Sequence, residues 1–139
     1  MQVKQLDHVN IQTANVDAMV EWYGRVLNMP SGKRPPFDFP GAWLYCGEHP
    51  VVHLVGVKEQ PAAGCRLEHF ALSASGFKDF LDRLKRDDER YEARRVPGNG
   101  VVQVNVWDPD GNHIHIDFPP EDAAGVEFAE APRAPRTLK

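Results

Sequence analysis

The stretch VNVWDPDGNHIHIDF, residues 104–118, decides how this chain folds, because it holds two alternating runs of side chains separated by a turn. In Asp108–Gly111 the proline presets φ, the aspartates can accept bonds from nearby backbone N–H groups, and the glycine tolerates a positive φ. After the turn, a strand would place His113, His115 and Asp117 on one face and three apolar side chains on the other. The apolar face belongs against a helix, whereas the polar face either meets solvent or lines a cavity.

The composition narrows the class of protein. A chain of 139 residues is long enough for one domain with a core, and a net charge of −4 gives no sign of a nucleic-acid surface. Cys46 and Cys65 form no CxxC pair, which argues against a disulfide framework or a cysteine zinc site and fits a reducing cytoplasm. No apolar run approaches the roughly 20 residues that a membrane span needs, and Met1–Gln5 has no apolar signal core. We therefore expect a cytoplasmic protein without nucleic-acid or membrane partners.

Alternation and helical periodicity predict the elements of the first half of the chain. Residues 6–13 alternate and should form a strand, with Thr13 or Asn15 capping the helix that follows. The proline-rich segment 33–40 should be irregular or an edge strand, and strands over 42–46 and 51–57 should pair as a hairpin. The helix is marked by an apolar stripe of Val16, Met19, Val20, Tyr23 and Leu27.

The same order of elements restarts in the second half. Leu67–Ser73 repeats the Leu-acid-His pattern of Leu6–Gln12, and a helix capped by Ser75 should follow. Residues 121–139 are rich in proline, alanine and charge, which predicts an extended or disordered tail, or an arm laid on a partner subunit. The second helix should bury Phe77, Phe80, Leu81 and Leu84, and the strands after it should span 91–95, 101–107 and 113–118. Trp22 and Trp107 are expected to pack in the core.

The repeat gives the histidines a common pattern. His8 and His53 lie 45 positions apart and His69 and His115 lie 46 apart, so each half places one histidine in its first strand and one in its last. Two such units related by a pseudo-twofold axis would bring four histidines towards one point. His113 shares a face with His115 but lies one pleat further along, and His49 is expected in an exposed turn.

Three motifs carry a resemblance to a known family. LDHVNI (6–11), LEHFAL (67–72) and DPDGNxI (108–114) resemble the vicinal oxygen chelate superfamily, which contains glyoxalase I, bleomycin-binding proteins, fosfomycin-resistance proteins and extradiol dioxygenases. The resemblance implies an α+β fold, with two βαβββ modules, about 4–58 and 65–120, forming a cup-shaped mixed sheet around one divalent metal. It also implies a single domain over residues 1–120 and a homodimer, with 121–139 as the tail.

The resemblance further implies a ligand set of His8, His53, His69 and His115. In the superfamily a Glu usually follows DPDGNxI, where this chain has His115, and glyoxalase-type members often have Glu at the position of His53. Without either carboxylate, a glyoxalase mechanism loses its expected base. His53 is thus a fourth ligand or a proton-transfer group, His115 could itself move a proton, and Asp117 could serve as a general base or hydrogen-bond to a ligand.

An all-histidine site favours particular metals and substrates. Neutral imidazoles suit transition metals, and we expect Fe²⁺, Zn²⁺, Mn²⁺ or Ni²⁺. Because neutral ligands leave the ion its full charge, the site should prefer an anionic, oxygen-bearing molecule such as an enolate, catecholate or carboxylate. Phe37 and Phe39 could add an apolar wall, and Arg94 could approach an anionic group. If the strand phases hold, the substrate-binding residues are Asn10, Trp43, Tyr45, Ser73 and Gln103, with Asn105 facing the same side.

Three functions remain open at this point. The first is a metal-dependent enzyme that chelates a small oxygenated, anionic metabolite through two oxygens, with dioxygenase-like or isomerase/lyase (glyoxalase-like) chemistry. The second is a metal-free binding or sequestration protein of the bleomycin-resistance type, which would not need four matched histidines. The third is a transferase resembling the fosfomycin-resistance enzymes, which normally keep the carboxylate that His115 replaces.

Overall fold

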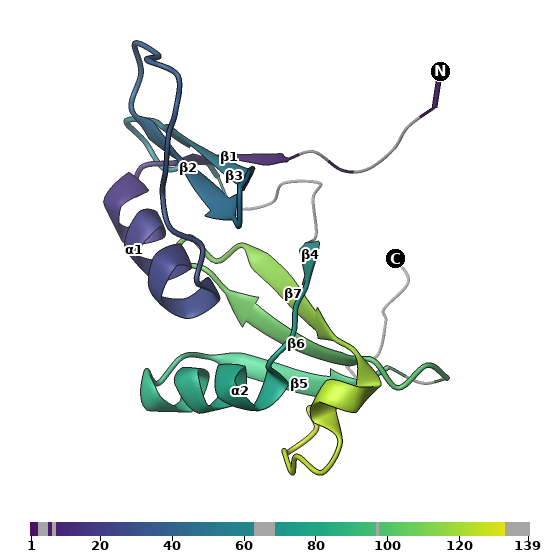
Figure 1. The fold of residues 1–139 in the computed structure, drawn as a ribbon. Helices are drawn as coiled ribbons and strands as arrows, with labels where there is room; N and C mark the ends of the chain where they lie inside the picture. The colour runs from purple at the N-terminus through teal and green to yellow at the C-terminus, as the bar shows by residue number, and fades with distance from the viewer. Residues whose placement is uncertain (3–5, 7, 63–68, 97, 133–139) are drawn as a thin grey trace, which may run out of the picture. The chain divides into compact units, whose positions relative to one another are not determined.

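The computed structural model describes residues 1–2, 6, 8–62, 69–96 and 98–132 (Figure 1). Its contacts divide the chain into two compact units, residues 1–66 with 108–110, and residues 67–107 with 111–139. Each unit contains one mixed sheet and one α-helix, so the α+β class predicted from the sequence is confirmed. Several residues named in the sequence predictions lie outside the described part of the chain, namely Asp7, Cys65, residues 66–68 and residues 133–139 of the predicted tail.

The first unit contains β1 (Val9–Thr13), α1 (Val16–Leu27), β2 (Gly41–Cys46) and β3 (His49–Gly56). The strands are ordered β1-β3-β2, with β1 parallel and β2 antiparallel to β3. Residues 33–40 form no strand, as predicted for an irregular segment. Ser31 makes an isolated bridge to Leu44, where the second unit has a full strand.

Helix α1 buries Met19, Trp22, Tyr23 and Val26, which lie one turn apart in pairs on a single face. The burial of Trp22 confirms its predicted place in the core. The helix ends at Asn28, which adopts a left-handed φ of 54° and donates its N–H to the Tyr23 carbonyl. Asn15 is the N-cap residue but its side chain makes no capping bond.

The turn Asp108–Asp110 supplies polar partners within this first unit. The hydroxyl of the fully buried Tyr23 donates to Asp108 Oδ2 at 3.0 Å, and Asp108 is itself only 4% exposed. The side chain of Asn15 donates to Asp110 Oδ1 at 3.0 Å instead of capping α1. Burial alone would raise the pKa of Asp110, but hydrogen bonds from Thr13, Asn15 and Gln60 outweigh it and lower that pKa.

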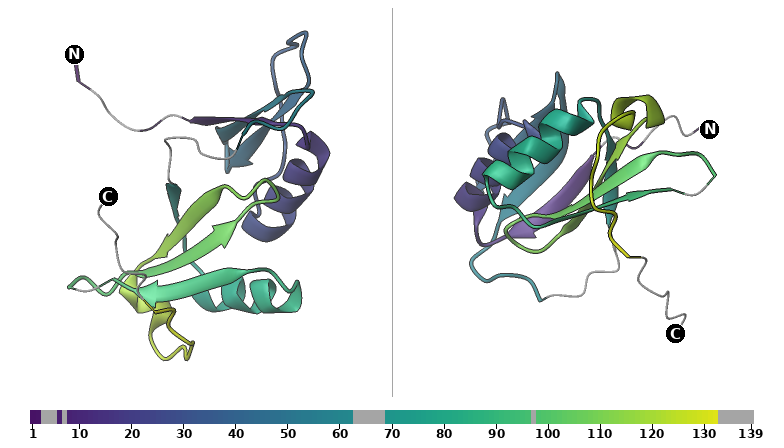
Figure 2. Two further views of the ribbon diagram at one scale, coloured as in Figure 1. Left: turned by 180° about the vertical axis from the view of Figure 1, so that it is seen from behind. Right: turned by 90° about the horizontal axis from the view of Figure 1, so that it is seen from below.

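The second unit contains β4 (Phe70–Ser73), α2 (Phe77–Arg86), β5 (Tyr91–Arg95), β6 (Val102–Trp107), β7 (His113–Phe118) and the short 3₁₀ helix η1 (Pro120–Ala123). Its strands are ordered β4-β7-β6-β5, with β4 parallel to β7 and the other pairs antiparallel. Figure 2 shows α2 lying along this sheet.

The core of the second unit lies between α2 and one face of its sheet. Phe118 contacts Phe77 and Phe80 at ring-centroid distances of 5.4 and 5.8 Å. Each fully buried side chain of this size contributes about 1.5–3 kcal/mol of transfer free energy. The alternation of the strands is thus fixed by burial, which leaves their other face polar. The buried strand residues are Phe70, Ala93, Val102, Val104, Val106, Ile114, Ile116 and Phe118.

The described part of the C-terminal segment folds back on its own unit. The Phe128 ring meets Phe77 edge-on at 5.1 Å, and Ala131 donates its N–H to the Ala93 carbonyl at 2.8 Å.

The predicted cap at Ser75 is wrong, because α2 begins after Gly76, whose φ of 83° suits glycine. The N–H of Gly76 is instead accepted by Asp122 Oδ2 at 2.7 Å.

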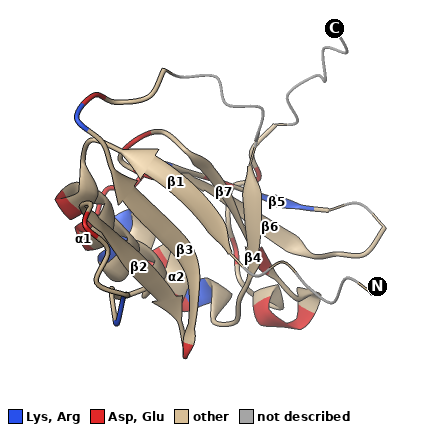
Figure 3. Cartoon of the chain, turned by 90° about the horizontal axis from the view of Figure 1, so that it is seen from above, with Lys and Arg blue, Asp and Glu red and all other residues tan. Residues whose placement is uncertain are grey.

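Charge is concentrated outside the strands of both units. Figure 3 shows β1, β2 and β3 without any lysine, arginine, aspartate or glutamate. Among the described strands, the charged residues are Glu92, Arg94, Arg95 and Asp117. The polar faces of the sheets therefore consist mostly of neutral groups. Within the described residues, no helix has both the length and the apolar character that crossing a membrane requires.

Candidate metal centre

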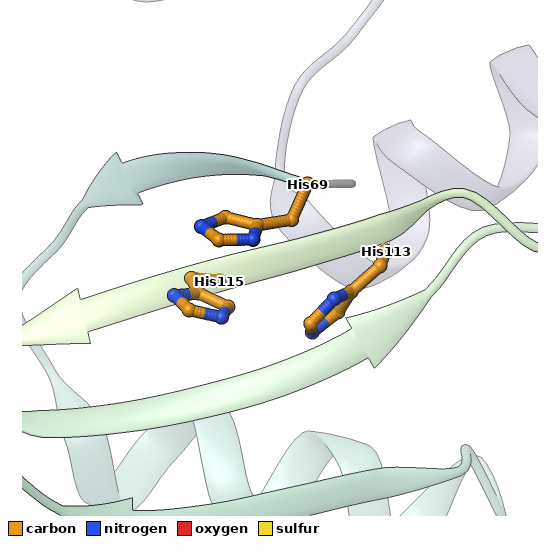
Figure 4. Close-up of side chains that lie close together, drawn as sticks. All are labelled: His69, His113 and His115. Carbon is orange, nitrogen blue, oxygen red and sulfur yellow. The ribbon is translucent and has the colours of Figure 1, made fainter. Parts of the chain in front are cut away.

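Three histidines meet on the polar face of the β4-β7-β6-β5 sheet (Figure 4). His113 and His115 alternate with buried isoleucines along β7, and His69 immediately precedes β4, the parallel neighbour of β7. The rings of His69 and His115 stack at 4.1 Å and 13°, and His113 lies 5.0 Å from His115 and 5.4 Å from His69. One ring nitrogen from each of the three lies within 4.8 Å of the other two, so this triad could hold a metal ion.

The first unit holds a corresponding pair of imidazoles. His8 and His53 stack at 3.9 Å and 14°, and Trp43 covers the His53 ring at 4.1 Å and 8°. His53 Nε2 lies 3.0 Å from the Pro50 carbonyl oxygen. Because a carbonyl oxygen only accepts, Nε2 carries the proton and Nδ1 keeps its lone pair. Metal-binding histidines are commonly held in this way, with the second ring nitrogen bonded to a carbonyl or carboxylate.

Strand register explains why the two pairs look alike. Asn10 lies two residues after His8 and pairs with His53, and Ala71 lies two residues after His69 and pairs with His115. The first and last strands of each unit are thus parallel in the same register, which stacks one imidazole on the other. The internal repeat predicted from the sequence is confirmed at this level. The convergence of both pairs on one cation, and the role of His8 and His53 as ligands, stay predictions.

The donor set of the triad fits a divalent transition metal. Two nitrogens on one tetrahedral Zn²⁺ lie about 3.3 Å apart if each bond is about 2.0–2.1 Å, so ring nitrogens within 4.8 Å of one another need only a small movement. All three rings are half-buried, which limits competition from water without closing the site. Three neutral ligands would leave positions open for a substrate.

Two buried polar atoms on the same face have no hydrogen-bond partner among the described residues. They are Asp117 Oδ1 on β7 and Arg94 Nε on β5. Gln103 of β6 pairs with both residues, so all three occupy one row across the sheet, next to the row that contains His115. An unpaired buried polar group costs about 1–3 kcal/mol. An acceptor and a donor in one row therefore suit a ligand that carries both a hydroxyl and an anionic oxygen.

The other predicted substrate-binding residues have different surroundings. Asn10 and Ser73 are exposed on β1 and β4, and Gln103 Nε2 lies 3.4 Å from His115 Nδ1. Tyr45 donates its hydroxyl to the Lys33 carbonyl at 2.6 Å, which ties β2 to the segment that precedes it. The role of each as a substrate contact stays a prediction.

Two residues near the triad, Trp107 and Asn105, have surroundings that differ from those predicted from the sequence. Trp107 was expected in the core, but it stacks on the His113 ring at 5.3 Å and 12° on the polar face. Its phase with Gln103 and Asn105 along β6 was the signal that could have revealed this. Asn105 was expected only to face the site, yet it is 3% exposed and bonds directly to His113.

Comparison with known proteins agrees with this architecture. The family model described as Glyoxalase/Bleomycin resistance protein/Dioxygenase superfamily matches residues 5–116. The chain belongs to this superfamily. None of the curated proteins compared matches the chain. The match covers both units and every histidine of the candidate site, so the resemblance predicted from the sequence motifs is confirmed.

Solved structures with the same fold belong to several organisms. A glyoxalase family protein from Bacillus anthracis is 20% identical, with a TM-score of 0.72, over 86% of this chain and 98% of that one. Lactoylglutathione lyase from Agrobacterium tumefaciens is 16% identical, with a TM-score of 0.66, over 87% and 98%. The trypanothione-dependent glyoxalase I of Leishmania major is 17% identical, with a TM-score of 0.62, over 86% and 88%. At these identities the likeness shows the fold alone, and two βαβββ modules are consistent with it.

Proposed function

We propose that this superfamily member is a metal-dependent enzyme that acts on a small, anionic, oxygenated metabolite. The observation that carries the proposal is the gathering of His69, His113 and His115 on one polar sheet face. A strand face exposed only to solvent has no need of three neighbouring imidazoles. With the metal bound, the site would supply Lewis-acid polarisation of two substrate oxygens. The resident ion is Fe²⁺, Zn²⁺, Mn²⁺ or Ni²⁺.

The proposed ligand set contains four histidines. His69 and His115 hold the ion, and His8 and His53 complete the set that the superfamily resemblance implies. The Nε2–H of His53, directed at the Pro50 carbonyl, supports Nδ1 as its ligand atom. If His53 stays outside the coordination sphere, the same lone pair can accept a substrate proton.

Asp117 and Arg94 are proposed to handle the organic part of the substrate. Asp117 Oδ1 is unpaired and buried, so it can accept a proton or a hydroxyl hydrogen bond from a bound molecule. Arg94 already pairs with Glu92 at 3.0 Å through one terminal nitrogen, and its Nε remains available for an anionic oxygen. Gln103 and Ser73 flank Asp117 in the same row and would contact the substrate. Asn10, Trp43 and Tyr45 are also proposed as substrate-binding residues.

The reaction is proposed to be dioxygenase-like or an isomerase/lyase reaction. Metal analysis of protein purified without chelator distinguishes these classes. Iron or manganese with oxygen uptake on catechols supports ring cleavage, whereas zinc or nickel without oxygen uptake supports isomerase or lyase chemistry. Lack of binding by every one of these ions after reconstitution would overturn the proposal in favour of a metal-free sequestration protein of the bleomycin-resistance type.

A substitution at His69 tests the site directly. His69→Ala should lower Zn²⁺ affinity at least about tenfold, because loss of a direct ligand should exceed the effects known for groups one shell further out. His49→Ala is the matched control, since His49 is exposed at the start of β3 and should leave the affinity unchanged. Equal affinities for His69→Ala and the wild type would remove His69 from the site. We also propose that the protein is a cytoplasmic homodimer. Sedimentation of the purified protein would test its oligomeric state.

A further inference from the structure

We infer that His113 is a metal ligand through Nδ1, and that the buried Asn105 selects this nitrogen. The inference rests on the proposed function, because it concerns the same ion. It differs from the ligand set implied by the family, because His113 here joins His69 and His115, and three ligands leave positions on the ion open for two substrate oxygens. It starts from one side-chain amide with two fixed partners.

The amide orientation of Asn105 is determined by its neighbours. Asn105 Nδ2 donates to the Glu92 carbonyl oxygen at 3.0 Å. Because a carbonyl only accepts, the atom facing Glu92 must be the nitrogen, and Oδ1 faces the other way. Oδ1 lies 2.8 Å from His113 Nε2. An amide oxygen also only accepts, so His113 Nε2 must carry the proton in the neutral ring.

The consequence for His113 is a fixed tautomer. With Nε2 protonated, Nδ1 keeps the lone pair, and a metal binds only to such a nitrogen. Because Asn105 is only 3% exposed, water cannot take the place of His113. Rotation of the His113 ring away from it would therefore leave a buried amide oxygen unpaired. The same arrangement exists at His53, where the Pro50 carbonyl takes the place of Asn105 Oδ1.

Trp107 limits the remaining freedom of the His113 ring. Its indole stacks on the imidazole at 5.3 Å with an interplanar angle of 12°, and Arg90 lies over the indole at 3.9 Å. The hydrogen bond that His113 donates to Asn105 acts in the ring plane, and the indole acts on the ring face. Together they hold His113 beside His69 and His115, which lie within the 4.8 Å cluster (Figure 4).

The first unit lacks this third imidazole. Two residues before His53 the chain has Val51, and the partner of His53 on β2 is Trp43 where His115 has Asn105. A third histidine and the amide that orients it thus occur together in the second unit. Orientation of a ligand by a buried amide is worth about 10–100-fold in metal affinity.

The experiment measures Zn²⁺ binding to the full chain by calorimetry, with the absorption spectrum of the Co²⁺ form as a second measure. His113→Ala should weaken Zn²⁺ binding at least about tenfold, as His69→Ala and His115→Ala should. Asn105→Leu, which matches the volume but removes the amide, should weaken it about 10–100-fold. His49→Ala is the control, and thermal unfolding checks that each variant is folded.

Nuclear magnetic resonance of the metal-free protein gives a measure that is independent of activity. At about pH 8.5, well above the usual histidine pKa, long-range ¹H–¹⁵N correlations should show His113 as the Nε2–H tautomer in the wild type. A Nδ1–H tautomer would overturn the role of Asn105. If His69→Ala and His115→Ala weaken Zn²⁺ binding but His113→Ala does not, this inference fails and the proposed function stands. If none of the three weakens binding, both fail.

Discussion

Replacing Tyr23 with phenylalanine removes one oxygen from the interior of the first unit. Its hydroxyl donates to Asp108 Oδ2 at 3.0 Å, and neither side chain is more than 4% exposed. A hydrogen bond to a charged acceptor contributes about 1.5–3 kcal/mol, because burial prevents water from replacing the lost donor. We therefore expect Tyr23→Phe to lower the free energy of unfolding by about 2 kcal/mol and the Tm by roughly 5–8 °C.

Urea unfolding followed by tryptophan fluorescence measures this loss. Tyr45→Phe is the matched control, because the Tyr45 hydroxyl donates at 2.6 Å to the Lys33 carbonyl at the surface and should cost less than about 1 kcal/mol. A double-mutant cycle with Asp108→Asn should give a coupling energy of about 1–2 kcal/mol. A loss for Tyr23→Phe no larger than for Tyr45→Phe would refute the reasoning.

The same pair predicts a dependence on alkaline pH. Burial, together with the Asp108 charge, raises the pKa of Tyr23 well above its usual value of 10.0. Since the folded-state pKa is the higher one, the stabilisation is fully present below about pH 10 and is lost as the pH rises through the folded-state value. Tyr23→Phe should therefore flatten part of the alkaline decline in stability.

Three further predictions concern charge, backbone and metal. Asp110→Asn should be less stable than the wild type at pH 7, and the difference should vanish in acid. The lowered pKa of Asp110 stabilises the fold above about pH 4, and this stabilisation is lost as the pH falls through the folded-state pKa. Urea unfolding at pH 7 and at pH 3 measures the difference. Gly41→Ala should lower the free energy of unfolding by about 2 kcal/mol or more, since its Cβ would lie 2.2 Å from the Leu54 carbonyl oxygen. Gly24→Ala, whose Cβ would have nothing within 4 Å, should instead stabilise α1 by about 0.5–1 kcal/mol. Equal effects of the two substitutions on the free energy of unfolding would contradict this. Zn²⁺ at a hundred times its Kd should raise the free energy of unfolding by about 2.7 kcal/mol, and a chelator should reverse the shift; an unchanged Tm would argue against a site in the folded state.

Much of the candidate site follows from local alternation. The period of two along β7 puts His113, His115 and Asp117 on one face once the isoleucines are buried, and no tertiary detail is needed for this. The repeat of Leu-acid-His before each first strand likewise identified His8 and His69. The predicted strands beginning at residues 6 and 101 are shorter in the structure, which starts β1 at Val9 and β6 at Val102.

Contacts between distant segments were not readable in the same way. Alternation along β6 gives the face of Asn105, but only the register of β6 against β5 and β7 places its amide between Glu92 and His113. The cap of α2 failed for the same reason, because the acceptor for Gly76 comes from Asp122, 46 residues later. Side chains that are far apart in sequence meet only when strand register and packing bring them together.

The sequence by itself therefore determined the two repeated units, the superfamily and the sheet faces, since each depends on short-range spacing. The tertiary structure decided which imidazoles touch, which of their nitrogens face an acceptor, and which buried polar atoms have no partner among the described residues. The physical reason is that a side chain's face depends on its neighbours along the strand, whereas its hydrogen-bond partner depends on the register of the strands beside it.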